Sequence, residues 1–115
     1  MKRSDSLKRK KEFRYTYRAG KSAPGRLTVL IYTKNHRPAT RAGFSVSKKI
    51  GGAVVRNRAK RRMREALTPL LPRIRTGYNI IFVAREPIVN AAFTEIGAGF
   101  EAQLKRAGLM NGEQN

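Results

Sequence analysis

The densest positive charge of the chain lies in residues 52–67, GAVVRNRAKRRMREAL. Six of the nine residues from Arg56 to Arg64 are Lys or Arg. A planar guanidinium holds a phosphate with two parallel hydrogen bonds, so an Arg-rich face is suited to a phosphate backbone. A face that only met solvent would interleave Glu with its cations. We therefore interpret this segment as a phosphate-binding surface.

Two lysines and two glycines precede the basic segment and extend it. Gly51 and Gly52 leave room for a phosphate at the N-terminus of the following helix, where free N–H groups point outward. A glycine pair before a helix is a weak signal by itself. The residues predicted to bind phosphate are Lys48, Lys49, Arg56, Asn57, Arg58, Lys60, Arg61 and Arg64.

A helix from about Ala53 to Leu71 explains how so many like charges are held together. On a helical wheel the apolar residues gather on one side, and they are Val55, Ala59, Met63, Ala66, Leu67 and Leu70. Burial of this stripe against a sheet stabilises by about 25 cal/mol per Å², which outweighs the repulsion between the charges.

Composition limits both the size of the protein and its partners. The 115 residues predict a single domain over residues 1–110, followed by a mobile tail over 111–115. A net charge of +19 favours a polyanionic partner, and nucleic acid is the first choice. A membrane surface would call for bulky apolar residues on the basic helix, where Ala, Val and Met prevail. With no Cys and no signal-peptide or membrane-spanning stretch, we expect a cytosolic protein without membrane contact.

The rest of the chain predicts helices packed on a sheet. The expected elements are a helix over about 6–18, a loop over 20–25, strands over 26–34 and 41–49, a strand over 78–85 and a helix over 90–107. The first two strands flank a turn at 35–38 and are expected to form a hairpin. The apolar run YNIIFVAR predicts a central strand buried on both faces. This order is typical of a small α/β sandwich.

The sequence offers no catalytic or metal-binding constellation. The seven acids are scattered, whereas a two-metal nuclease clusters carboxylates around ions about 4 Å apart. His36, the single His, lies in the turn NHRP, where an exposed turn residue is the simpler interpretation. We therefore predict no catalytic residue and no metal ligand in the protein itself.

The segment GFSVSKKIGGAVVRNRAKRRMRE, residues 43–65, resembles the signature of the bacterial ribonuclease P protein component. The match is an ordered string: FSVSKK, the glycine pair, Arg56-Asn57-Arg58, then Lys60, Arg61 and Arg64. Weaker similarity covers the basic N-terminus, Glu12-Phe13 and IIFVAR. The chain departs from the family at Ala59, where a larger aliphatic residue is usual, and this affects core packing.

The resemblance implies a fold, a partner and an activity. The fold would be α/β (α+β), a small two-layer sandwich of a roughly four-stranded mixed sheet with helices, containing a left-handed βαβ crossover as in a ribosomal-protein-like fold. The protein would be the accessory, monomeric subunit of a bacterial cytoplasmic endoribonuclease. Its RNA subunit would remove the 5′ leader of precursor tRNA and hold the divalent metal, Mg, so the protein alone would bind no cofactor.

The same resemblance implies a cleft for the single-stranded leader between the first helix and the sheet. By position, Phe13, Tyr17 and Tyr32 are similar to the family's aromatic cleft residues. Aromatic stacking beside a basic groove is how single-stranded RNA is commonly held. The competing interpretation is that all three are ordinary core aromatics.

Three other functions remain open at this point. A ribosomal protein of similar size and charge would show no preference for a leader. A stand-alone metal nuclease is disfavoured by the scattered acids. A duplex-DNA binder would need base-reading Asn or Gln, and Asn57 is the single such residue in the basic run.

Overall fold

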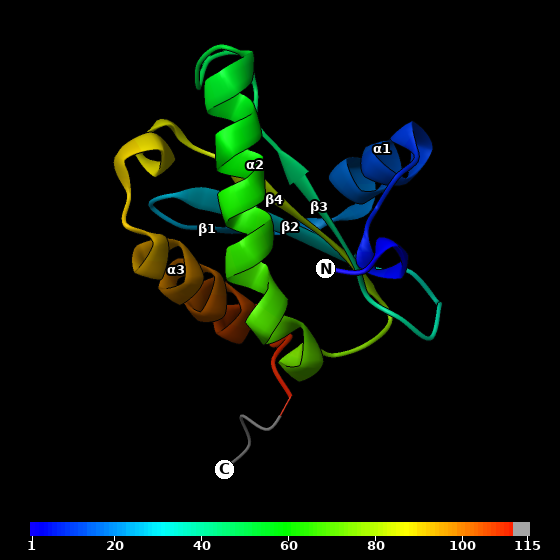
Figure 1. The fold of residues 1–115 in the computed structure, drawn as a ribbon. Helices are drawn as coiled ribbons and strands as arrows, with labels where there is room; N and C mark the ends of the chain where they lie inside the picture. The colour runs from blue at the N-terminus through cyan, green and yellow to red at the C-terminus, as the bar shows by residue number, and fades with distance from the viewer. Residues whose placement is uncertain (112–115) are drawn as a thin grey trace.

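The computed structural model describes residues 1–111, so residues 112–115 of the expected tail lie outside the described part of the chain. Four strands form one sheet in the order β1-β2-β4-β3 (Figure 1). They are β1 (Lys21–Pro24), β2 (Thr28–Lys34), β3 (Arg41–Ser45) and β4 (Tyr78–Ala84). β4 pairs antiparallel with β2 and parallel with β3, which confirms the mixed sheet.

The predicted hairpin between residues 26–34 and 41–49, which correspond to β2 and β3, is wrong. β4 lies between β2 and β3, so Phe82 pairs with Leu30 on one side and with Phe44 on the other. The central position of β4 is confirmed, and Ile80, Ile81 and Phe82 have no exposed surface. A strand of mostly apolar residues is stabilised most when it pairs along both edges and both of its faces are buried.

The segment predicted as a loop over residues 20–25 is also different, because most of it is β1. β1 pairs antiparallel with β2, with Ala23 opposite Leu30 and Pro24 opposite Val29. Pro24 lacks an N–H and is tolerated because β1 is at the edge of the sheet. The turn to β2 is closed by the Gly25 N–H, which donates to the Thr28 carbonyl at 2.9 Å.

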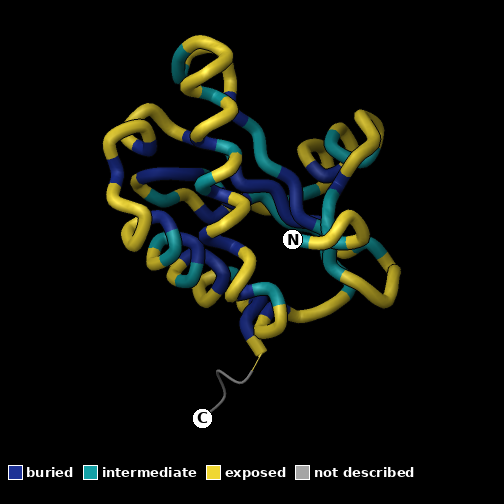
Figure 2. Tube along the Cα trace, in the orientation of Figure 1, coloured by how far each residue is buried: buried dark blue, intermediate teal, exposed yellow. Residues whose placement is uncertain are grey.

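Two helices cover one face of the sheet. They are α2 (Ala53–Leu67), which continues as a 3-10 turn over Thr68–Arg73, and α3 (Phe93–Arg106). The predicted apolar stripe of α2 is confirmed at Ala59, Met63, Ala66, Leu67 and Leu70, all buried, while Val55 stays 36% exposed in the first turn. Figure 2 shows the buried parts of the chain along the sheet, with exposed residues along the outer sides of the helices.

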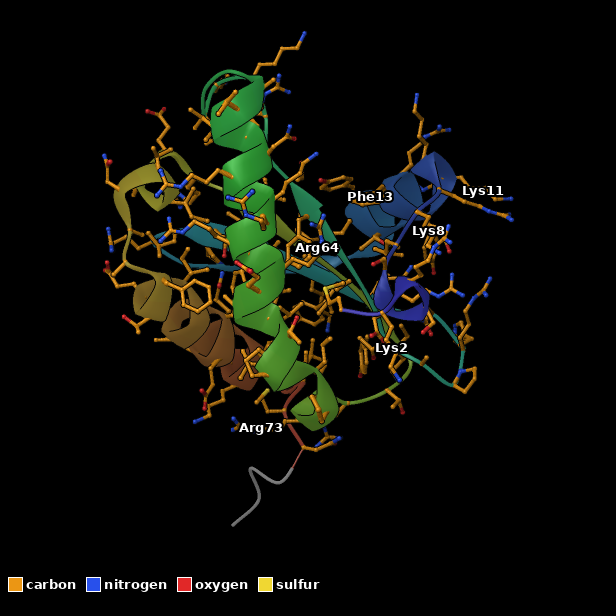
Figure 3. All side chains as sticks on the ribbon, in the orientation of Figure 1. Lys2, Lys8, Lys11, Phe13, Arg64 and Arg73 are labelled. Carbon is orange, nitrogen blue, oxygen red and sulfur yellow. The ribbon has the colours of Figure 1, made fainter. Side chains whose placement is uncertain are left out.

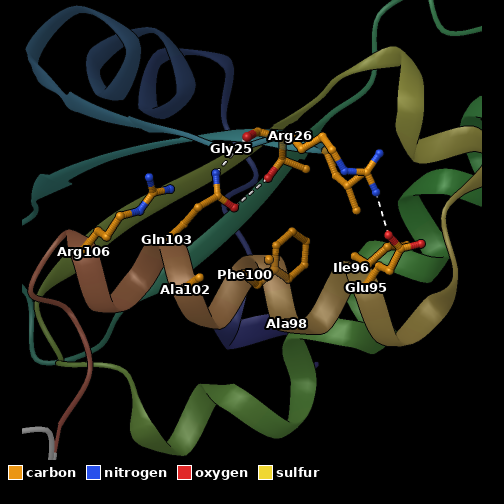
Figure 4. A pocket seen from close by; sticks show the side chains of 12 residues that line it. Gly25, Arg26, Glu95, Ile96, Ala98, Phe100, Ala102, Gln103 and Arg106 are labelled. Atoms are coloured by element: carbon orange, nitrogen blue, oxygen red, sulfur yellow. Dashed lines mark hydrogen bonds and ion pairs between the residues drawn. The ribbon is translucent and has the colours of Figure 1, made fainter.

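A buried amide fastens α3 to the sheet. Gln103 Nε2 donates to the carbonyls of Ala23 and Thr28 at 2.9 and 2.8 Å, and Gln103 Oε1 accepts from Thr28 Oγ1 at 2.9 Å. Figure 4 shows this amide turned toward the β1–β2 turn, beside a cavity of about 390 Å³ whose rim carries the Arg26–Glu95 ion pair. All hydrogen-bonding groups of a buried amide are thus engaged.

The first helix, α1 (Lys10–Ala19), packs on the opposite face of the sheet. The predicted start near Ser6 is wrong by four residues: Glu12 Oε1 accepts from the Arg9 N–H at 3.2 Å and caps the helix there. Ser6 and Leu7 instead run along the free edge of β3, where the Leu7 N–H donates to the Ala42 carbonyl. A short 3-10 turn, Arg3–Asp5, precedes them.

The connection from β3 through α2 to β4 joins two parallel, adjacent strands. With β3 pointing up in Figure 1, α2 lies in front of the sheet and β4 lies to the left of β3. The crossover is therefore left-handed, an uncommon hand for a βαβ unit. The expected α/β class, mixed four-stranded sheet and crossover are confirmed.

Candidate nucleic-acid interface

One flank of α2 carries a row of cations at four-residue spacing. Arg56 and Lys60 are half-buried and Arg64 is exposed. Residues four apart lie above one another on a helix, so the row follows the helix axis. Figure 3 shows Arg64 extending from α2 toward the side on which the N-terminal segment and α1 lie.

The outward side of α2 adds Asn57, Arg58 and Arg61, all exposed. Among residues 1–111, no cation of α2 forms an ion pair, and Glu65 forms none either. Some cations elsewhere are neutralised: Arg26 pairs with Glu95, and Arg41 pairs with Glu12. The helix therefore presents uncompensated charge, which a polyanion would relieve.

Two arginines of α2 differ from the rest. Arg62, which was not among the predicted phosphate-binding residues, donates from a terminal guanidinium nitrogen to the Ala91 carbonyl at 2.7 Å and ties α2 to the segment before α3. Arg56 Nε is buried and has no hydrogen-bond partner within residues 1–111. Sequence spacing could not separate Arg62 from its neighbours, because its partner is 29 residues away.

The N-terminus of α2 is open, as the glycine pair predicted. Gly52 is the N-cap and provides no side-chain cap, and a Cβ built on it would meet no atom within 4 Å. Lys48 and Lys49 are exposed in the preceding turn. Lys49 also lines a surface cavity of about 340 Å³ with residues 84–87, at the end of β4.

The three aromatic residues predicted to form a cleft do not all lie on one face of the sheet. Phe13 packs on the α1 face of the sheet, against Gly43, and is half-buried. Tyr17 follows one turn later on α1 and is 42% exposed. On the same face Ile31 lies beside the end of α1, within 2.8 Å of a Cβ built on Gly20.

Tyr32 is the exception and corrects the predicted set. It alternates with Ile31 along β2, so its side chain points to the other face and packs with the core under α2 and α3. The expected sharing of a face by Tyr32, Leu30 and Thr28 is confirmed, but that face is opposite Phe13. The core interpretation therefore holds for Tyr32.

Three of the acids form ion pairs that connect separate parts of the fold. Glu12 accepts from Arg41 at 3.3 Å, Glu95 from Arg26 at 2.6 Å, and Glu101 from Arg73 at 3.2 Å. Within residues 1–111 no group of three or more His, Cys, Asp or Glu could hold a metal ion. In the same residues, no helix has the length and apolar character needed to cross a membrane.

Hydrogen bonds and neighbouring cations hold the pKa of each of these three carboxyls below its ordinary value. The hydrogen bond from the Ala92 N–H, reinforced by Arg26, holds the pKa of Glu95 below its ordinary value. Hydrogen bonds from Lys105 and Arg73 do the same for the pKa of Glu101. Burial raises the pKa of Glu12, but the backbone groups of Arg9 and Lys8, with Arg41, outweigh it and leave the pKa lowered.

The sequence of the chain matches one protein family along nearly its whole length. The family model described as Ribonuclease P matches residues 1–108. A ribonuclease P protein component of Symbiobacterium thermophilum is 41% identical over 114 residues, covering 98% of this chain and 99% of its own. One from Chloroflexus aurantiacus is 38% identical and covers 100% and 86%.

Solved structures agree with the sequence comparison. The RNase P protein of Staphylococcus aureus superimposes with a TM-score of 0.83 at 33% identity, covering 93% of this chain and 98% of its own. The RNase P protein of Thermotoga maritima gives a TM-score of 0.80 at 27% identity, covering 88% and 96%.

Proposed function

Because this chain belongs to the ribonuclease P protein family, we propose that it is the protein subunit of a bacterial ribonuclease P ribonucleoprotein. In this role it assists a catalytic RNA in the endonucleolytic removal of the 5′ leader from precursor tRNA. The observation that carries the proposal is the cationic surface of α2, which has no ion-pair partner within residues 1–111.

In this proposal the α2 surface binds the RNA subunit. Arg56, Lys60 and Arg64 contact the phosphates along one RNA strand. Arg58 and Arg61 extend outward from the helix toward the same RNA. Lys48, Lys49 and the open N-terminus of α2 extend the contact to a further phosphate. Counterion release from the RNA supplies most of the affinity, so binding weakens steeply with salt.

The leader of the substrate lies on the α1 face of the sheet. Phe13 and Tyr17 border a strip of half-exposed residues, Val29, Ile31 and Val83, that α1 leaves uncovered. Tyr17 offers the most exposed aromatic ring of this surface for stacking on an unpaired base. Phe13, held against Gly43, forms the boundary of the surface and positions α1.

The protein supplies charge and substrate contacts, and the RNA supplies the chemistry. Glu12, Glu95 and Glu101 are each held by arginines at separate places, so they do not form a site for a divalent ion. In this proposal the metal, Mg, is held by the RNA. Because mature tRNA lacks the leader, leader contacts favour substrate over product in a monomeric subunit of a cytoplasmic enzyme.

The test is reconstitution of the protein with a bacterial ribonuclease P RNA. Affinity is measured for precursor tRNA with and without its 5′ leader, with RNA alone as the reference. The proposal expects the protein to raise affinity for the leader-bearing form, and expects cleavage at physiological salt to depend on the protein. Equal affinity for both forms, or cleavage that ignores the protein, would refute it.

A further inference from the structure

A second basic cavity lies at the end of the sheet away from the N-terminus of α2. It has a volume of about 440 Å³ and is lined by Lys34, His36, Arg75, Thr76, Gly77, Tyr78 and Asn111. Three separate segments contribute: the end of β2, the start of β4 and the chain after α3. No Asp or Glu is among the lining residues.

The two cations of this cavity, Lys34 and Arg75, have no acidic partner among residues 1–111, and His36 lies beside them. Lys34, His36 and Arg75 are exposed, and none of their side chains forms an ion pair or hydrogen bond with residues 1–111. Other exposed arginines of comparable reach, such as Arg26 and Arg73, are paired with glutamates. The cavity is therefore, like the α2 surface, a place where cations have no acidic partner among residues 1–111.

The loop that follows Lys34 and carries His36 is held in place by its own hydrogen bonds. Asn35 Oδ1 accepts from the Arg37 N–H at 2.8 Å, and Asn35 Nδ2 donates to the Ala39 carbonyl and to Asn79 Oδ1. His36 between them has a positive φ of 59°, the left-handed region that Asn, Asp and His tolerate best. A pre-ordered loop loses little entropy when it binds.

The Arg75 side of the cavity is equally anchored. The Arg75 N–H donates to the Leu109 carbonyl at 2.7 Å, and the Arg75 carbonyl accepts from Thr40 Oγ1. Tyr78 packs against the core and is half-buried, and its remaining exposed surface lines the cavity beside Lys34, its partner in the β2–β4 ladder. An accessible aromatic edge beside cations is a combination that can hold an unstacked base with its phosphate.

We propose that this cavity is a second RNA-binding site, which takes one phosphate and the adjacent unstacked base of an RNA strand. The inference rests on the proposed function and extends it. The site lies at the opposite end of β4 from the open N-terminus of α2, about 20 Å away over six strand steps. The protein therefore contacts RNA at two separated places and fixes their relative position.

The first experiment removes the two longest cations, Lys34→Gln with Arg75→Gln. The matched control is Arg26→Gln with Lys105→Gln, which removes the same charge from side chains already paired with Glu95 and Glu101. Binding is measured against salt, for the ribonuclease P RNA and separately for precursor tRNA on the reconstituted enzyme. Each lost phosphate contact lowers the slope of log affinity against log salt by about 0.7–0.9.

The site variant is expected to lower the slope by about one contact with one of these RNAs, which identifies the RNA bound, while the control keeps its slope. A site variant equal to the control with both RNAs overturns the inference. Arg61→Gln, measured in parallel, separates this from the proposed function. If Arg61→Gln lowers the slope and the site variant does not, the proposed function stands and the second site is rejected. If neither does, both fail.

A second experiment does not depend on affinity. The chain has no Cys, so Thr76→Cys provides a single attachment point for an iron chelate that cleaves nearby RNA. Ala98→Cys, exposed beside the cavity under α3, is the control. Strand cleavage from position 76 but not from position 98 supports the site, and equal cleavage from both positions contradicts it.

Discussion

The ring of Phe13 lies directly on the backbone of Gly43, so that a Cβ on Gly43 would be 2.5 Å from Cζ of Phe13. Through this contact the Phe13 ring holds α1 over β3 at a position where the strand has no side chain. It sets the distance between α1 and the sheet, and so the shape of the surface proposed to hold the leader.

Gly43→Ala is therefore expected to destabilise the protein by about 1–3 kcal/mol, because the methyl group forces α1 or the Phe13 ring to move. Urea denaturation measures the change. Gly99→Ala is the control, since a Cβ there meets no atom within 4 Å and a helical Gly→Ala exchange is neutral or favourable. The double variant Phe13→Leu with Gly43→Ala should recover part of the loss; an unchanged midpoint for Gly43→Ala alone would contradict the contact.

Tyr17 and Tyr15 form a matched pair for testing the leader surface. Both lie on α1 and are exposed to nearly the same degree, 42% and 40%, but Tyr15 is two residues, roughly half a helical turn, from Tyr17. Tyr17→Ala is expected to weaken binding of leader-bearing precursor tRNA by about 1–3 kcal/mol, the value of one base–aromatic stack. Tyr15→Ala should leave it unchanged. If the two variants lose the same affinity for leader-bearing precursor tRNA, the leader does not bind this surface.

Glu12 predicts a stability difference that depends on pH. Its pKa is lowered in the folded protein, so its ionised form stabilises at neutral pH, and this contribution is lost as the pH falls below the ordinary value of 4.5 and through the lowered one. Glu12→Gln keeps a hydrogen-bond acceptor for the Arg9 N–H but loses the charge beside Arg41 and the helix N-terminus.

The expected cost of Glu12→Gln is about 0.5–2 kcal/mol at neutral pH, and it shrinks toward zero once the pH falls below the lowered pKa of Glu12. Chemical denaturation of both proteins across this range measures it. Glu86→Gln is the control, because Glu86 is exposed and makes no ion pair within residues 1–111; its effect should stay within about 0.5 kcal/mol. If Glu12→Gln still lowers the free energy of unfolding in acid, the lost charge is not the cause of the lower stability.

The sequence predicted the α2 stripe and the central strand because both follow from hydrophobic periodicity. It could have excluded the hairpin as well. A hairpin of residues 26–34 with 41–49 leaves the third strand only one neighbour, which conflicts with an apolar run buried on both faces. β1 was not predictable in this way, since KSAP has neither alternation nor β-branched residues and pairs only because β2 offers a free edge.

The aromatic set was wrong in one member for a geometric reason. The register was correct, with Tyr32 on the face of Thr28 and Leu30, but the sequence of this strand did not show that α1 covers the opposite face of the sheet. The α1 face was identifiable from Gly43, which alternates with Ala42 and Phe44 and leaves space that only a ring from another element fills. Arg62 could not be recognised from sequence, because its carbonyl partner is set by tertiary packing.

Arg61 and Arg62 are neighbours in sequence with opposite expected roles. Arg61 is exposed and lacks an ion pair within residues 1–111, so Arg61→Gln should lower the salt slope of RNA binding by about one contact and leave stability unchanged. Arg62→Gln breaks the 2.7 Å hydrogen bond to the Ala91 carbonyl, so it should cost about 1.5–3 kcal/mol of unfolding free energy and leave the slope unchanged.

The two variants carry the same charge change on adjacent residues, and each therefore controls for the other. Salt-dependent binding to the ribonuclease P RNA and urea denaturation are measured on both. A basic helix that attracted RNA only through its total charge would lose the same slope in both variants. If only Arg61→Gln lowers the salt slope and only Arg62→Gln lowers stability, the RNA contacts the outward side of α2. Arg61 is exposed on that side, whereas Arg62 is held against the Ala91 carbonyl.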